Sequence, residues 1–109
     1  MTHETSTLYE DIHALLQEAP GAEQGAFLAR LEHTLTDGYA RALVLEAERM
    51  RLARRMDELT YGLQDDPGDA PTDELATVAR RLSDTDSELT SLRETLAGLR
   101  ARARAIRAA

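Results

Sequence analysis

Residues 63–75 read LQDDPGDAPTDEL, an acidic stretch that holds two prolines and one glycine between two leucines. Proline and glycine interrupt helices, so the helical pattern that leads into this stretch ends here. It resumes at Thr72, where a capping hydroxyl is followed by Asp73 and Glu74, two carboxylates at the positive end of a new helix. We therefore expect residues 64–71 to form an acidic loop between two long helices.

On both sides of this loop, apolar residues recur in alternating steps of three and four, the spacing of a coiled-coil seam. After the loop, the row is Leu75, Val78, Leu82, Thr85, Leu89, Leu92, Leu96, Leu99, Ala103 and Ile106. Before it, the row is Leu28, Leu31, Leu35, Gly38, Ala42, Leu45, Arg49, Leu52, Met56, Leu59 and Leu63. A short loop forces neighbouring helices to run antiparallel. The rows therefore predict one long antiparallel helical hairpin, over about 22–63 and about 72–107, with Leu63 beside Leu75 and Leu31 beside Ile106.

Two members of the earlier row have alternative interpretations. Gly38 is expected to let Leu99 approach closely, but a glycine inside a helix costs about 1 kcal/mol relative to alanine, so it could also mark a kink or a break. Arg49 either sets the register and extends its guanidinium into solvent, or faces a ligand between the helices. The first interpretation is favoured for both residues.

A short helix is expected before the hairpin. Thr7 and Glu10 have the spacing of a capping box, and Leu8, Ile12 and Leu15 follow at helical spacing, which predicts a helix over about 7–18. The chain of 109 residues is then a single all-α domain, residues 1–109.

The composition excludes several classes of function. A net charge of -7 argues against general nucleic-acid binding, and the absence of cysteine removes disulfides, thiolate nucleophiles and cysteine-ligated metals. No stretch is apolar enough for a membrane span, so a soluble, cytoplasmic protein is expected. We find no metal-ligand spacing, no cofactor motif and no catalytic constellation, and we expect no enzyme. The basic tail (Arg100, Arg102, Arg104, Arg107) is expected beside the acidic start of the hairpin (Glu23, Glu32, Asp37).

In the middle of the first long helix, the apolar arc is too wide for contact with one neighbour. The excess residues are Tyr39, Ala40, Leu43, Val44, Ala47 and Met50. We expect them to form an interface between two copies of the chain, so that two hairpins make a four-helix bundle. The alternative is that the short first helix covers them.

Arginines form a second candidate site, for an anion. Arg51, Arg54 and Arg55 come from the first long helix, and Arg80 and Arg81 come from the second at nearby levels. A solvated face with intrahelical acidic partners is the more ordinary interpretation.

The long helices, rich in Leu, Glu and Arg, are similar to those of flagellar export chaperones, but the chain carries no motif specific to that family. Secreted hairpins of similar size carry a Trp-x-Gly turn, for which this chain has only Tyr61-Gly62. The ligand series of cyclic-di-GMP-binding anti-sigma hairpins fits neither long helix. The sequence therefore predicts a non-enzymatic protein-protein interaction module, a small bacterial helical-bundle regulator, adaptor or chaperone that acts as a homodimer. The alternative function is a nucleotide or anion sensor at the arginine cluster.

Overall fold

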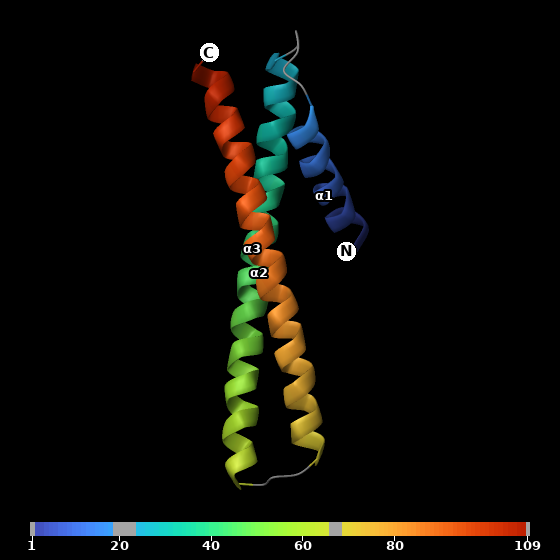
Figure 1. Ribbon diagram of the computed structural model, residues 1–109, viewed down its shortest axis with the longest axis vertical. Helices are drawn as coiled ribbons and strands as arrows, with labels where there is room; N and C mark the ends of the chain where they lie inside the picture. The colour runs from blue at the N-terminus through green and yellow to red at the C-terminus, as the bar shows by residue number, and fades with distance from the viewer. Residues whose placement is uncertain (1, 19–23, 66–68, 109) are drawn as a thin grey trace. The chain divides into compact units, whose positions relative to one another are not determined.

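The computed structural model of the chain describes residues 2–18, 24–65 and 69–108. Within these ranges every residue except Glu18 is helical, and there is no strand. The helices are α1 (Thr2–Gln17), α2 (Gln24–Asp65) and α3 (Asp69–Ala108), and α2 and α3 pair as an antiparallel hairpin (Figure 1). The all-α class and the hairpin are thus confirmed.

Each helix begins or ends outside the range expected from the sequence. Helix α1 begins at Thr2 rather than at Thr7, so the expected capping residue lies inside the helix. Helix α3 begins at Asp69, which places Pro71 in its first turn, where the missing N–H has no helical acceptor in any case. The expected loop is shortened accordingly, and its remaining residues 66–68 lie outside the described part of the chain.

Every predicted seam position is buried or half-buried. The side chains that are almost completely enclosed all belong to the two rows: Leu31, Leu45, Leu89, Leu92, Leu96 and Leu99. Side chains from each row fill the space between the two helices. Each Å² of apolar surface that they remove from water stabilises the fold by roughly 25 cal/mol.

The chain divides into two compact units. The two-helix unit, residues 43–90, contains the end of α2 and the start of α3. Its buried core cluster consists of Leu52, Leu59 and Val78. Met56, Leu75 and Leu82 are partly buried and pack against this cluster. The predicted register, with Leu63 beside Leu75, also sets Met56 beside Leu82, and both belong to this one cluster.

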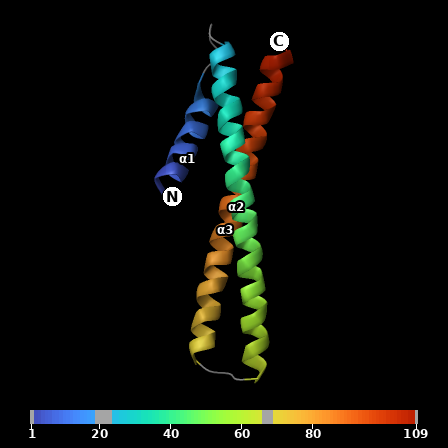
Figure 2. The same cartoon turned by 180° about the vertical axis from the view of Figure 1, so that it is seen from behind.

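The three-helix unit contains residues 1–42 and 91–109. Figures 1 and 2 show α1 beside the first part of α2 from both sides. Leu8, Ile12 and Leu15 are the buried side of α1, and Leu16 lies close to the backbone of α3 at Gly98. The short helix thus completes a third layer at this end of the hairpin.

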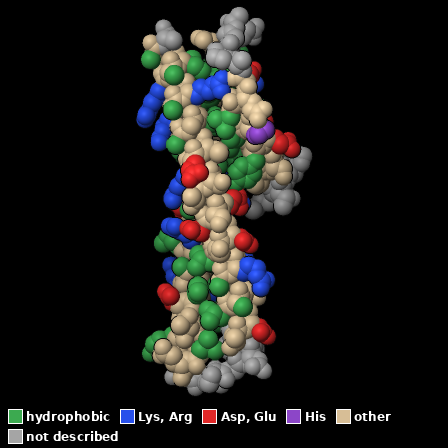
Figure 3. All heavy atoms as spheres, in the orientation of Figure 1, with side chains coloured by type: hydrophobic (Ala, Val, Ile, Leu, Met, Phe, Trp, Pro, Cys, Tyr) green, Lys and Arg blue, Asp and Glu red, His purple; other side chains and the backbone are tan. Residues whose placement is uncertain are grey.

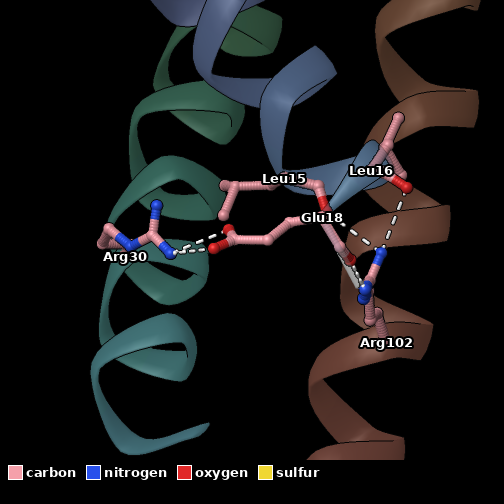
Figure 4. Close-up of polar contacts among 5 residues, drawn as sticks. All are labelled: Leu15, Leu16, Glu18, Arg30 and Arg102. Atoms are coloured by element: carbon pink, nitrogen blue, oxygen red, sulfur yellow. Dashed lines mark hydrogen bonds and ion pairs between the residues drawn. The ribbon is translucent and has the colours of Figure 1, made fainter. Parts of the chain in front are cut away.

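Arg102 on α3 holds the carboxyl end of α1 (Figure 4). Its Nη1 donates to the carbonyl oxygens of Leu15 at 3.0 Å and Leu16 at 3.1 Å, and its Nη2 donates to the carbonyl of Glu18. The last carbonyls of a helix have no intrahelical donor and carry partial negative charge, so a guanidinium satisfies them and stabilises the helix end. The same guanidinium lies 5.0 Å from the ring centre of Phe27.

The basic tail meets acidic residues in part, as the charge pattern predicts. Arg107 forms an ion pair with Glu32. Arg102 instead binds backbone carbonyls, and Glu18 at the end of α1 is paired with Arg30 of α2 at 2.8 Å. The predicted participant Glu23 lies outside the described residues.

Helix α2 continues through Gly38 without a break. Gly38 faces Leu96 rather than the expected Leu99: a Cβ at this position would lie 3.3 Å from Cγ and 3.4 Å from Cδ1 of Leu96, with Cδ2 closer still. Leu96 is 2% exposed, so it has little room to move. Close helix approach is therefore the reason for this glycine.

Candidate functional site

The outer face of α2 in the two-helix unit carries large apolar side chains that nothing in the described chain covers. Leu43 is 67% exposed, Met50 61% and Val44 48%, and Ala47 between them is also exposed. In Figure 3, hydrophobic side chains of this unit reach the surface mainly along the line between its two helices. Single exposed apolar residues are common on protein surfaces, whereas neighbouring ones on one helix face indicate a binding surface.

The position of these residues follows from the helical repeat. Leu43 lies two residues before the buried Leu45, and Met50 lies two residues before the buried Leu52. At about 100° per residue, a separation of two residues is a rotation of about 200°, so both side chains point away from α3. We call Leu43, Ala47, Met50 and Arg54 the outer row, because they share this rotation and follow one another in steps of four, three and four.

Tyr61 continues the outer row and was not included in the predicted interface. It is 72% exposed and lies two residues after the buried Leu59. The signal was present in the sequence, since Arg54, Asp57 and Tyr61 keep the steps of three and four. The polar members Arg54 and Asp57 hide this continuation from a search for apolar residues alone.

The other two residues of the predicted interface, Tyr39 and Ala40, belong to the three-helix unit and are exposed there. In that unit, α1 buries its apolar side against its neighbours, while Leu43 and Met50 of the two-helix unit remain exposed. The role of these side chains as an interface stays a prediction.

Two of the arginines proposed to bind an anion already face carboxylates of their own chain. Arg55 donates from Nε and Nη2 to Glu74 at 3.0 and 2.7 Å, and from Nη1 to Glu58 at 3.2 Å. These hydrogen bonds, that to Glu74 first, raise the pKa of the Arg55 guanidinium. Arg81 lies 3.6 Å from Glu48, so it too faces a carboxylate of the other helix.

Arg51, Arg54 and Arg80 are exposed, and the described part of the chain offers them no carboxylate partner. Arg80 lies two residues after the buried Val78, on the outer face of α3, as Arg54 lies on the outer face of α2. One hairpin therefore presents Arg54 and Arg80 to opposite sides, and a shared anion site would need a second molecule.

Arg49, the charged member of the seam, extends to the surface. Its Nη1 lies 3.1 Å from Oδ1 of Asp86 across the hairpin. The aliphatic part of the side chain occupies the seam while the head group is solvated, as expected for a residue that sets the register.

A shallow groove in the three-helix unit is basic. Arg100, Arg104 and Arg107 line it together with Glu32 and Thr36 and with Leu35 and Ala103. Arg107 pairs with Glu32 in this groove.

Histidines make local contacts: His33 lies 3.5 Å from Asp37 on the next turn, and His13 contacts Gln17. Over the residues that the structure describes, no three His or acidic side chains come together as metal ligands would. None of the described helices has an apolar stretch long enough to cross a membrane.

The chain matches no protein-family model, no curated protein and no solved structure.

Proposed function

We propose that this protein is a non-enzymatic protein-protein interaction module, a small bacterial, cytoplasmic helical-bundle regulator, adaptor or chaperone that acts as a homodimer. The observation that carries the proposal is the exposure of Leu43, Val44 and Met50 on one face of α2. The seam with α3 is complete without them, so their apolar character has no role within the two-helix unit.

The energy available from this face is comparable with the cost of association. Full burial of a Leu, Val or Met side chain in an interface stabilises the complex by about 1.5–3 kcal/mol. The exposed fractions of the three side chains correspond to roughly 3–5 kcal/mol per copy, or about 6–10 kcal/mol for two copies. Association itself costs on the order of 4–15 kcal/mol, so these three residues support a weak dimer and the flanking residues must add to it.

A second copy is the simplest occupant because a two-fold axis brings the same surface from both molecules into contact. Two hairpins joined through α2 form a four-helix core of the kind that short connections favour. In such an assembly, the α3 helix of the two-helix unit stays on the outside and remains free to bind another protein.

Static light scattering of the full chain from about 1 to 500 μM tests the proposal. We expect the mass to rise from the 12.1 kDa of one chain towards twice that value. A mass that stays at that of one chain throughout would remove the homodimer from the proposal.

A further inference from the structure

The charges beside the outer row indicate how two copies are oriented. Within the two-helix unit, Glu46 flanks the first part of this row, and Arg54 is the last of its four members, before Asp57 and Tyr61 continue it. Two parallel copies would place Arg54 against Arg54 and Glu46 against Glu46. Two antiparallel copies place the basic end of one row over the acidic end of the other, so charge complementarity selects the antiparallel arrangement.

From this we infer that the copies associate antiparallel through the outer row, with the two-fold axis crossing α2 between Ala47 and Met50. The inference rests on the proposed homodimer and specifies its geometry. In this register Met50 packs over Ala47 of the second copy, a large residue against a small one, as an interdigitated seam requires.

The register also accounts for the arginine in an otherwise apolar row. Arg54 lies opposite Leu43 of the second copy, and its aliphatic stem covers that leucine. Its guanidinium then reaches Glu46 of the second copy, about three residues or 4–5 Å away along the helix. Glu46 is half-buried and already makes a contact within its own chain, so Arg54 is an additional partner for it. Arg54 has no carboxylate partner in the described part of its own chain, so the dimer supplies one.

Apolar contact lies at the centre of this surface and an ion pair at each end. Leu43, Val44, Ala47 and Met50 of both copies meet around the axis, while the two Arg54–Glu46 pairs close the ends. This is the anatomy of a specific interface, with an apolar centre and a polar rim. The ion pairs fix the orientation, and the apolar side chains provide most of the affinity.

Disulfide trapping tests the orientation, because the chain has no cysteine of its own. In the antiparallel register, the two copies of position 50 are offset by about three residues, or 4–5 Å along the axis. With helix axes 8–10 Å apart, their Cα atoms are roughly 6–7 Å apart, within reach of a disulfide. The two copies of position 61 are offset by about 25 residues, or roughly 37 Å.

The experiment compares Met50→Cys with Tyr61→Cys under mild oxidation, after circular dichroism has shown that both variants are helical. Both positions are more than half exposed, so neither substitution removes core packing. We expect Met50→Cys to form a disulfide-linked dimer and Tyr61→Cys to form at least tenfold less. The mass of the unmodified chain is measured in parallel.

Equal cross-linking of both variants would indicate parallel copies, which overturns the inferred orientation and leaves the homodimer standing. A dimeric mass without a disulfide at position 50 would overturn the assignment of the outer row. A monomeric mass for the unmodified chain would overturn the proposed homodimer itself, and the inferred orientation with it.

Discussion

Replacing Met50 with glutamate should separate the two copies without unfolding either. Met50 is 61% exposed in one chain, so a charged group at this position is solvated in the monomer and disturbs no seam contact. In the dimer, the same position lies beside the two-fold axis. The substitution therefore acts on association rather than on the free energy of unfolding of the hairpin.

The magnitude follows from the exposed fraction. Full burial of a Met side chain contributes about 1.5–3 kcal/mol, so covering the exposed 61% contributes roughly 1–2 kcal/mol per copy. Removing it from both copies costs about 2–4 kcal/mol, and two carboxylates brought together near the axis add at least about 1 kcal/mol of repulsion. A loss of roughly 3–5 kcal/mol raises the dissociation constant by at least about 100-fold.

Sedimentation equilibrium of Met50→Glu beside the unmodified chain measures this change. The matched control is Ala76→Glu, which adds the same charge to an exposed position of α3, two residues before the buried Val78. We expect the control to dimerise like the unmodified chain. An unchanged dissociation constant for Met50→Glu, or an equal weakening by both substitutions, would refute the role of this face.

Three further predictions follow from the described contacts. Gly38→Ala should lower the free energy of unfolding by about 1–3 kcal/mol, because Leu96, which packs against this glycine, cannot move aside. Gly62→Ala should raise the free energy of unfolding by about 0.5–1 kcal/mol, because alanine favours the helix and meets no neighbour there. Thermal or urea unfolding measures both changes. Arg102→Ala should loosen the end of α1 by about 1–2 kcal/mol, seen as faster amide hydrogen exchange throughout α1. Arg54→Glu should weaken the dimer about tenfold, and the double variant Glu46→Arg with Arg54→Glu should restore it, as sedimentation would show.

Each of these predictions has a control. Gly62 is matched to Gly38 because a Cβ at position 62 has no neighbour within 4 Å, so a loss of stability in both variants would count against the packing argument. For Arg102, the control is Arg104→Ala, which removes the same side chain from α3 without touching α1. Equal exchange in the two arginine variants would show that Arg102 does not hold the helix end. For the charge swap, Glu46→Arg alone should weaken the dimer as Arg54→Glu does.

The hairpin was predictable because its signal is repeated many times. The steps of three and four recur over both long helices, and a shift by one residue would expose leucines such as Leu31 and Leu99, which the structure encloses completely. The loop separating the rows fixed their antiparallel direction. Helix ends were less predictable, because they depend on one or two polar residues whose energies are small.

Contacts between distant residues could not be read from the sequence in the same way. The charge pattern indicated that Arg102 would approach acidic side chains, but its guanidinium donates to backbone carbonyls of α1. Every residue has a backbone carbonyl, so the sequence does not indicate which carbonyls an arginine will bind. The partner of Gly38 was displaced by one turn, from Leu99 to Leu96, because spacing fixes which residues face the seam and leaves their exact heights open.

The sequence indicated which kind of residue forms the candidate surface, but the predicted set of residues was incomplete. Leu43 and Met50 are apolar and could be recognised as excess over the seam, whereas Tyr61 was separated from them by Arg54 and Asp57. The anion site was predicted from the levels at which the arginines of the two long helices meet in the hairpin, and it stays a prediction. Rotation places Arg54 and Arg80 on opposite faces and Arg55 beside Glu74.

The most direct test of the central claim, that a second copy covers the outer face of α2, is the oxidation rate of Met50 as a function of protein concentration. Met56 serves as the internal reference, because it is half-buried in the seam cluster at every concentration. The account predicts that Met50 is oxidised several-fold more slowly at high micromolar than at low micromolar concentration, while the rate at Met56 stays constant. A rate at Met50 that does not change with concentration would contradict it.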